Sequence, residues 1–401
     1  MTAPSVWLRA FEAVTPLGDT WAATAAALAA GKSAVAPIAA FDCAGFPSTV
    51  ACEIAAPWAK VADRRRAIAL HAAERAWQAA ALTAAPERIG VFVGAESGRA
   101  EFATVRALAL AAGSGPAFDH GAFARFAPAL AARFDAGVAS PAAVAASIAG
   151  RVGALGPCET FSLACASSSA AIVEAVRALR GGECDVAVCG GVGADVDPLM
   201  LTGFGLLGML SSRGASCPFD IRRDGMVVGE GAAFFVLAIE RGPAMVEMAG
   251  VGRSLDAGHL TAPDPQGAGA VRAMRAALAD AGEVSVDCVQ AHGTSTPLND
   301  GIEIAALRQV LGEAAEQAYV SSVKGALGHW IAGAGAIGLC CAVHAVVAAE
   351  VLPTAGLRDV APECKARHVV GTAVRAPIRT ALANAFAFGG ANSCVVVRSA
   401  A

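Results

Sequence analysis

The residue in this chain whose type and setting most strongly suggest chemistry is Cys165. It lies in a run of small residues, 162–171, that leads into an apolar stretch with helical spacing at 172–179. A thiol at the start of a buried helix faces unpaired backbone N–H groups and the positive end of the helix dipole, and both favour the nucleophilic thiolate. The small neighbours leave room for an acyl group on the sulfur. The alternative is a structural cysteine, the usual state of a free thiol in an alanine-rich core.

Three polar clusters further along the chain carry the other candidate groups. They are His292-Gly293-Thr294-Ser295-Thr296-Pro297-Leu298-Asn299-Asp300, Lys324-Gly325-Ala326-Leu327-Gly328-His329 and Asn384-Ala385-Phe386-Ala387-Phe388-Gly389-Gly390-Ala391-Asn392-Ser393. Each alone is weak evidence, because a histidine beside glycines is commonly structural and a Gly-Gly turn commonly serves backbone geometry. A zinc site made of Cys165, His292 and His329 is conceivable, but no short ligand spacing supports it, so we expect no metal.

The composition excludes several classes of function. The chain has 401 residues and a formal net charge of −4, so it is not expected to bind nucleic acid. Its twelve cysteines form no C-x-x-C pair, and we expect reduced thiols rather than disulfides. Residues 1–14 do not have the pattern of a signal peptide, so a cytoplasmic location is expected.

One segment, 330–347, is long and apolar enough to suggest a membrane span. It contains several glycines and His344, and no basic residues follow it directly. A helix that is apolar all round is also what a layered protein buries at its centre. We therefore expect a buried helix and no membrane span.

The alternation of segments predicts an α/β fold. Short apolar runs typical of strands are 89–94, 186–191, 232–239, 288–291, 318–322 and 393–398. Alanine-rich runs typical of helices are 20–30, 64–82, 167–180, 267–281, 303–311 and 332–349. Near-continuous apolar strands separated by helices favour mostly parallel sheets covered on both faces.

The two parts of the chain share a pattern. In each part a strand ends in a polar, glycine-containing turn, and a later turn places reactive side chains before a helix. Those side chains are Cys165 in the first part, and Lys324 with His329 in the second. We therefore predict two duplicated halves, 1–245 and 246–401, with an extensive interface.

Taken in order, five motifs resemble those of the β-ketoacyl-ACP synthases, in the decarboxylating, elongating class with a Cys-His-His site. They are Ala164-Cys165-Ala166-Ser167; Pro218-Phe219-Asp220 with Arg223-Asp224-Gly225 and Gly229-Glu230-Gly231; His292-Gly293-Thr294-Ser295-Thr296; Lys324 with Gly328-His329; and Phe388-Gly389-Gly390-Ala391-Asn392. The resemblance covers 14–397. It implies a thiolase-like fold with two similar halves in a five-layer αβαβα sandwich, usually as a dimer.

The resemblance implies a role for each reactive residue. Cys165 would take an acyl group from an acyl carrier protein, with the oxyanion held by the backbone N–H groups of Cys165 and Phe388. Malonyl-ACP would then lose CO₂, and His292 and His329 would donate hydrogen bonds to the enolate oxygen. The product is a 3-oxoacyl-ACP, in fatty acid or specialised polyketide or polyene synthesis. Acyl groups arrive on the carrier's phosphopantetheine arm, so no other cofactor is expected.

Supporting roles are implied for the residues around these groups. Lys324 is expected to pair with Glu303 and tune the electrostatics of the site, although such a pair can equally be structural. Asp300 would belong to the same network. Thr294 and Thr296 are similar to residues that hydrogen-bond the pantetheine arm.

The entrance of the site is expected to involve four further residues. Thr261 lies in a loop at the entrance, and Phe388 is a candidate gate for the acyl pocket. Met226 stands where the family commonly has an aromatic residue, and Ala387 stands where glycine is usual, which favours a specialised pathway.

A basic run, Arg64-Arg65-Arg66, opens a predicted helix and could dock an acidic carrier protein, although it could equally be an ordinary solvated turn.

Three other classes remain as alternatives. A thiolase would use a second late cysteine, and carrier-initiating condensing enzymes use Cys-His-Asn, whereas this chain has His329. A silent, chain-length-determining subunit of a heterodimer usually lacks the nucleophile that Cys165 supplies. The chain could form a homodimer or pair with a second ketosynthase-like subunit.

Overall fold

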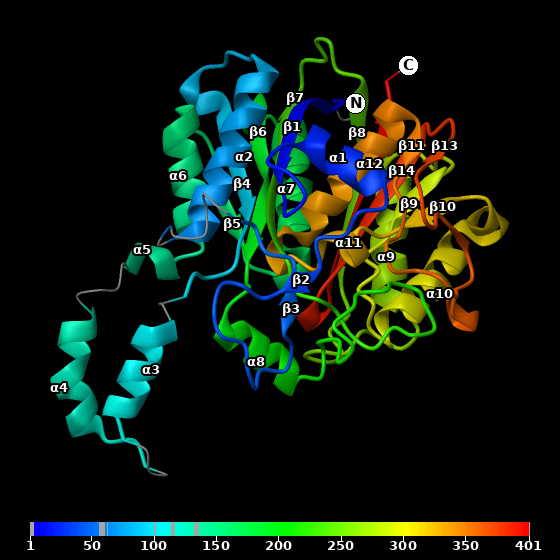
Figure 1. Cartoon of the computed structure of the whole chain (residues 1–401). Coiled ribbons are helices and arrows are strands. Elements are labelled where there is room, and N and C mark those ends of the chain that lie inside the picture. The colour runs from blue at the N-terminus through cyan, green and yellow to red at the C-terminus, as the bar shows by residue number, and fades with distance from the viewer. Residues whose placement is uncertain are drawn as a thin grey trace.

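An eleven-stranded sheet runs through the computed structural model, which describes residues 4–55, 61, 63–99, 102–113, 117–131 and 136–400 (Figure 1). Its order is β12-β10-β9-β14-β15-β8-β1-β7-β6-β4-β5. The strands are β1 (Trp7–Val14), β4 (Ile89–Gly94), β5 (Cys158–Phe161), β6 (Val186–Ala194), β7 (Glu230–Ala238), β8 (Val246–Leu255), β9 (Cys288–Gln290), β10 (Tyr319–Ser321), β12 (Arg367–His368), β14 (Thr380–Phe386) and β15 (Ala391–Ser399). Two small ribbons pair β2 (Ala36–Pro37) with β3 (Val50–Ala51), and β11 (Glu350–Val351) with β13 (Val374–Arg375).

Helices cover the sheet and occupy its centre. They are α1 (Trp21–Ala29), α2 (Arg64–Ala80), α3 (Phe102–Ala111), α4 (His120–Ala131), α5 (Ala136–Ala139), α6 (Ala142–Val152), α7 (Ser167–Gly181), α8 (Pro198–Leu206), α9 (Ala268–Asp280), α10 (Asn299–Leu311), α11 (Lys324–Leu327) and α12 (Ala334–Ala348). Single 3₁₀ turns that matter for the site are η3 (Ala164–Ala166), η5 (Ile331–Gly333) and η7 (Phe388–Gly390).

The two halves of the sheet have the same strand order. If strands are numbered within each half, β1, β4, β5, β6 and β7 lie in the order 3-2-4-5-1, and so do β8, β9, β10, β14 and β15. The halves join edge to edge through the short antiparallel pairing of β1 with β8. The boundary predicted at 245/246 falls in the connection between the end of β7 at Ala238 and the start of β8 at Val246.

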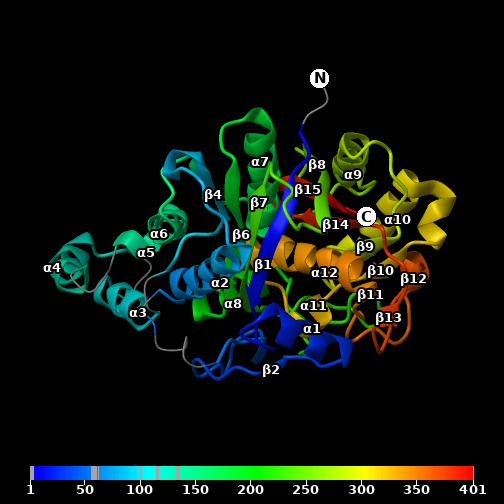
Figure 2. The same cartoon turned by 90° about the horizontal axis from the view of Figure 1, so that it is seen from above.

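The layers follow from which helices pack on which half-sheet. α2 and α6 cover the outer face of the N-terminal half-sheet, and α9 and α10 lie on the outer side of the C-terminal one. α7 and α12 pack between the halves and contact strands of both (Figure 2). The result is the five-layer αβαβα stack of the thiolase-like fold, with the ends of both central helices in the middle of the molecule.

The apolar segment that could pass for a membrane span is the central helix. Residues 331–348 have a mean hydropathy of 2.0, and 72% of this span is buried inside the protein. Its neighbours are the two half-sheets and α7. The segment is thus apolar round most of its surface because most of it packs inside the protein, with its C-terminal end exposed.

The sheet is mixed, which corrects the expectation of mostly parallel pairing. β4 pairs in parallel with β5 and β6, and β9 pairs in parallel with β10 and β14. The strands between them, from β6 through β7, β1, β8 and β15 to β14, are antiparallel. Of these strands, β6, β7 and β14 are buried almost throughout, so their pattern does not reveal their direction. β1 and β8 carry charged residues and do not read as apolar runs.

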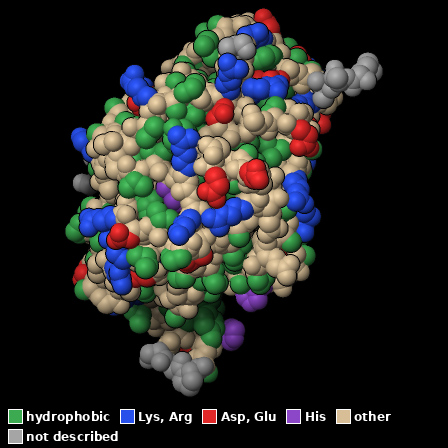
Figure 3. Space-filling model, turned by 90° about the vertical axis from the view of Figure 1, so that its right-hand side faces the viewer, with side chains coloured by type: hydrophobic (Ala, Val, Ile, Leu, Met, Phe, Trp, Pro, Cys, Tyr) green, Lys and Arg blue, Asp and Glu red, His purple; other side chains and the backbone are tan. Residues whose placement is uncertain are grey.

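The surface is mixed in charge where the C-terminal half faces outward. Basic and acidic side chains are interspersed over that face (Figure 3). This distribution agrees with the near balance of 30 basic and 34 acidic residues in the sequence.

Candidate active site

The candidate nucleophile, Cys165, sits in the tight turn η3 immediately before α7. Ala164 has a φ of 47°, a left-handed conformation that a residue with a side chain adopts only when its surroundings hold it there. The hydroxyl of Ser167 supports the turn, since it accepts the N–H of Leu163 at 2.8 Å and donates to the carbonyl of Ala164 at 2.7 Å. The Cys165 side chain is buried, with 5% exposed.

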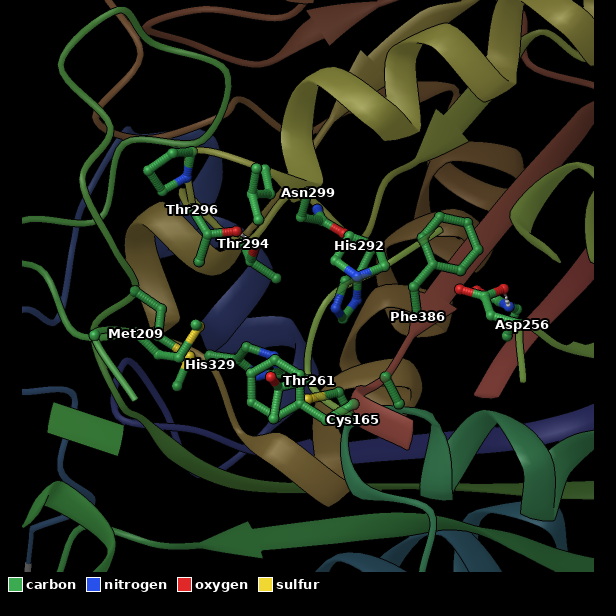
Figure 4. Close-up of a pocket in the computed structure, with 18 residues that line it drawn as sticks. Cys165, Met209, Asp256, Thr261, His292, Thr294, Thr296, Asn299, His329 and Phe386 are labelled. Carbon is green, nitrogen blue, oxygen red and sulfur yellow. Dashed lines mark hydrogen bonds between the residues drawn. The ribbon is translucent and has the colours of Figure 1, made fainter. Parts of the chain in front are cut away.

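Both candidate histidines come from the C-terminal half and meet Cys165 at the centre of the molecule. His292 follows β9, and His329 follows α11 and Gly328, whose φ is 68°. The sulfur of Cys165, one ring nitrogen of His292 and one ring nitrogen of His329 all lie within 4.8 Å of one another. The two rings are 5.4 Å apart and nearly perpendicular, and all three side chains face one cavity (Figure 4).

The contacts behind the rings decide which nitrogen of each histidine carries the hydrogen. Nδ1 of His329 accepts the backbone N–H of Ile331 at 3.1 Å, so its hydrogen is on Nε2. Nδ1 of His292 lies 3.5 Å from Nζ of Lys324, an ammonium that can only donate. Burial, and secondarily the charge of Lys324, hold the pKa of both imidazoles well below 6.5. Both rings are therefore neutral donors through Nε2.

This tautomer pattern bears on whether the cluster is a metal site. Cys165, His292 and His329 are an acceptable ligand set for zinc by residue type and proximity. A histidine binds a metal through an unprotonated nitrogen, whereas the free nitrogen of each ring here carries the hydrogen. The residues therefore fit hydrogen-bond donation to an oxygen better than metal ligation.

The state of Cys165 corrects one expectation from the sequence. Burial raises the pKa of its thiol to about 12, so the resting group is a thiol rather than the thiolate expected at a helix start. The charge of Lys324 lowers this pKa and that of Glu96 raises it. The backbone N–H groups of Phe388 and Cys165 face the sulfur and also lower the pKa.

Lys324 does not form the predicted ion pair with Glu303. Its ammonium instead donates to the backbone carbonyl of His292. Glu303 is buried and accepts the backbone N–H groups of His292 and Gly293, both at 2.8 Å, and the amide of Asn384 at 3.1 Å. The Glu303 carboxylate thus stabilises the backbone that carries His292, because its oxygens accept backbone N–H groups of this loop. Burial lowers the pKa of Lys324 to about 8.

Asp300 supports the same loop from the start of α10. Its carboxylate is fully buried and accepts the backbone N–H groups of Thr294 at 2.9 Å, Ser295 at 3.2 Å and Phe219 at 2.8 Å. Ser295 has a φ of 67°, so the carboxylate stabilises a loop conformation that a residue with a side chain seldom adopts. Asp300 acts on the polypeptide rather than on the cavity.

The cavity around the cluster has a volume of about 240 Å³. Thr294 and Thr296 line it, with their hydroxyl oxygens 2.8 Å apart. Thr261, Met226 and Phe388 also line it. The carbonyl of Leu260 accepts the N–H of Gly389, which ties the Thr261 loop to the Phe388 loop.

The basic run at the start of α2 is less available than predicted. Arg65 is 7% exposed, and its guanidinium donates to the backbone carbonyls of Glu96, Val138 and Ser140, which corrects its assignment to a docking surface. Arg64 pairs with the buried Glu230 at 2.6 Å, with 19% of its side chain exposed. Arg66 has 39% of its side chain exposed. The predicted surface for docking a carrier protein is therefore reduced to Arg66 and the exposed part of Arg64.

Several site residues were not singled out from the sequence. Met209, Asp256 and Asn299 line the cavity, and Asn384 holds Glu303. Glu96 lies beside the nucleophile turn. Asp256 directly follows β8, and Glu96 is the second residue after β4; a carboxylate just after a strand end was the available signal.

The comparison with family descriptions decides the assignment. Residues 5–241 match "Beta-ketoacyl synthase, N-terminal domain" and residues 245–358 match "Beta-ketoacyl synthase, C-terminal domain". This chain belongs to the beta-ketoacyl synthase family.

Several curated proteins similar to this synthase are named 3-oxoacyl-[acyl-carrier-protein] synthase 2. The 3-oxoacyl-[acyl-carrier-protein] synthase 2 of Coxiella burnetii is 33% identical over 96% of both chains. The protein of the same name from Synechocystis sp. is 41% identical over 60% of this chain and 61% of its own length. The synthase is thus an enzyme of the elongating class in the thiolase-like superfamily, as the motifs implied.

Solved structures agree in fold over the whole chain. The complex AntDE:AntF, a type II PKS acyl-carrier protein with its ketosynthase, has a TM-score of 0.85 at 27% identity and 99% coverage of both chains. The ishigamide ketosynthase/chain length factor has a TM-score of 0.84 at 31% identity and full coverage of both.

Proposed function

We propose that this synthase joins an acyl group, held on Cys165, to malonyl-ACP with loss of CO₂ and releases 3-oxoacyl-ACP. One observation carries the proposal. A buried thiol, two neutral histidine N–H donors and two backbone N–H donors all face one cavity. That arrangement matches the three demands of the reaction: a nucleophile, an oxyanion site and an enolate site.

The first step is transfer of the acyl group. The sulfur of Cys165 attacks the carbonyl carbon of an acyl-ACP thioester, and the bond from that carbon to the carrier's sulfur breaks. The proton lost by Cys165 ends on the released carrier thiol, so the step needs no added acid or base overall. The N–H groups of Cys165 and Phe388 stabilise the oxyanion, and losing one such donor typically costs about 10²–10³ in rate.

The second step forms the new carbon–carbon bond. Malonyl-ACP loses CO₂, and the electron pair left behind becomes an enolate whose oxygen accepts hydrogen bonds from His292 and His329. Its α-carbon attacks the acyl carbonyl on Cys165, and the Cys165 sulfur leaves and takes up one proton. Neutral histidines suit this role, since they donate without surrendering a full proton.

We also propose the partners and the setting. An acyl carrier protein delivers both substrates. Thr294 and Thr296 form hydrogen bonds with its pantetheine arm in the cavity. Support comes from the AntDE:AntF complex, in which a carrier protein is bound to its ketosynthase. Arg66 is proposed as a carrier contact. The free state of all twelve cysteines is compatible with a reducing, cytoplasmic setting.

The synthase is proposed to act as a dimer, either with itself or with a second ketosynthase-like chain. The α3–α4 hairpin projects from the body in both views (Figures 1 and 2). It exposes Leu110 at 61%, and Phe118 and Phe126 at 53% each. Such a cluster of large apolar side chains on a projecting element suits a protein–protein contact.

A chain-length-determining role is the second candidate, because two neighbours in structure are complexes with a chain length factor. The intact Cys165, His292 and His329 favour the active subunit of such a pair over its silent one.

The test is intact-protein mass spectrometry after incubation with a panel of acyl-ACPs. We expect wild type to gain the mass of one acyl group and Cys165→Ala to gain none. His329→Ala should still be acylated but should lose condensation with malonyl-ACP by about 10²–10³-fold, because it lacks an enolate donor.

His71→Ala, on α2 and outside the cavity, is the matched histidine control and should behave like wild type. Acylation of folded Cys165→Ala would disprove the nucleophile. No acylation of folded wild type by any carrier would overturn the stand-alone synthase.

A further inference from the structure

Glu96 contacts the nucleophile turn from the neighbouring strand. It follows the end of β4, and one of its carboxylate oxygens accepts the backbone N–H of Ala164 at 3.0 Å. The other accepts the hydroxyl of Ser162 at 2.7 Å. The hydroxyl of Ser167 lies 3.3 Å from the first oxygen. One carboxylate therefore binds groups on both sides of Cys165.

The turn needs such a partner. Ala164, directly before the nucleophile, has a φ of 47°, which is unfavourable for an alanine unless other contacts hold it. The N–H of Ala164 donates to the carboxylate of Glu96, which therefore satisfies a backbone donor at the strained residue.

Glu96 is itself held in place. The buried guanidinium of Arg65 donates to its backbone carbonyl and, in addition, to the carbonyls of Val138 and Ser140. The charge of this carboxylate acts on Asp195, which is paired with Arg99, and on the Cys165 thiol. The contact chain thus runs from α2 through the end of β4 to the nucleophile.

We propose that Glu96 is a positioning residue, whose carboxylate clamps the Ala164 turn and so fixes the direction of the Cys165 sulfur toward the oxyanion donors and the histidines. The inference rests on the proposed role of Cys165 as nucleophile. The clamp also has an electrostatic cost, since the charge of Glu96 raises the pKa of the thiol. The hydrogen bonds of Glu96 should favour acylation by positioning the sulfur, whereas its charge disfavours formation of the thiolate. Variants can therefore test the two effects separately.

Two variants separate them. In Glu96→Gln the amide oxygen can still accept from Ala164 and the amide NH₂ can donate to Ser162, so the clamp stays and the charge is lost. In Glu96→Ala both are lost. Glu87→Ala removes an exposed carboxylate just before β4 and is the matched control.

Two readouts are measured on each variant. The first is the rate constant of Cys165 acylation by the acyl-ACP that wild type accepts. The second is the pH midpoint for alkylation of the Cys165 peptide by iodoacetamide, followed by mass spectrometry, which needs no carrier protein. The midpoint reports thiolate formation, and loss of a purely structural contact would not move it downward.

We expect Glu96→Ala to acylate about tenfold to a hundredfold more slowly than wild type, because the sulfur is misplaced. Glu96→Gln should acylate within about threefold of wild type while its alkylation midpoint moves to lower pH. Glu87→Ala should match wild type in both.

Acylation of Glu96→Ala at the wild-type rate would overturn the clamp. So would a Glu96→Gln variant as slow as Glu96→Ala with an unmoved midpoint. If Glu96→Ala does not fold, the Glu96→Gln pair of readouts decides alone. A wild type that alkylates at Cys165 but is not acylated would refute the proposed reaction instead.

Discussion

At the scale of single residues, the site is held by buried charges that do not pair with one another. The carboxylate oxygens of Glu303 and Asp300 accept hydrogen bonds from backbone N–H groups, and Lys324 donates to a backbone carbonyl. Each charge therefore makes its hydrogen bonds to a loop, while the negative charges of Glu303 and Asp300 still favour the charged form of Lys324 and oppose the effect of burial on its pKa. The arrangement costs stability, because burial penalises every one of these charges.

Lys324 gives a prediction about stability. Its pKa falls from an ordinary value of 10.5 to about 8 in the folded protein. Between those values the unfolded chain holds more protons on this lysine, so its contribution to stability rises with pH across that window. Below pH 8 the buried ammonium costs a constant amount of about 3 kcal/mol.

We expect Lys324→Met to be more stable than wild type by about 1–3 kcal/mol at pH 7, and this gain to shrink toward zero near pH 10. Urea unfolding of both proteins at the two pH values measures the difference, in which other titrating groups largely cancel. Condensation activity should fall, because the Nδ1 partner of His292 is lost. An equal gain at both pH values would contradict the assigned pKa.

At the scale of elements, the nucleophile is placed by close contact between a strand end and a helix start. Gly94 ends β4 against Ser167 and Ser168 of α7, and a Cβ atom on it would overlap their backbone. The sheet and the helix can approach this closely only because the residue has no side chain.

We therefore expect Gly94→Ala to destabilise the fold by about 1–3 kcal/mol, because the overlap must push α7 and its turn away from the sheet. Acylation of Cys165 should fall with it. Gly150→Ala in α6, where a Cβ meets open space, is the control and should be neutral or more stable by up to about 1 kcal/mol. Thermal unfolding and acylation of the purified variants measure both, and equal behaviour of the two would refute the contact argument.

At the scale of the whole molecule, the α3–α4 hairpin is the feature that a single copy leaves unexplained. Packing it against a second chain would cover its exposed phenylalanines. We expect wild type to run as a dimer in size-exclusion chromatography with light scattering. The double variant Phe118→Asp, Phe126→Asp should shift toward monomer, because charges replace the apolar contact.

Leu155→Asp, at an apolar position outside the hairpin that is 71% exposed, should leave the dimer unchanged. If the purified wild type runs as a monomer, the result would favour a heterodimer with a second chain. A double variant that stays dimeric would place the interface elsewhere.

The sequence alone determined the identity and order of the reactive groups. Cys165, His292 and His329 occur in motifs of recognisable type, and the apolar run at 330–347 could be assigned to the interior from its glycines and its flanks. These features are local: a residue's type and its neighbours in the chain specify them. The alternation of strands and helices was likewise sufficient for the α/β class.

The tertiary structure decided what depends on distances through space. The tautomer of His329 follows from Ile331, whose backbone N–H contacts its Nδ1 atom. The tautomer of His292 follows from Lys324, which is 32 positions away in the sequence and contacts its Nδ1 atom. Strand direction, the partner of Glu303 and the raised pKa of Cys165 are of the same kind. A pKa sums burial and charge from all directions, and a hydrogen bond goes to whichever group folding brings nearest. Glu96, separated from Ala164 by 68 positions, belongs to the site for that reason alone.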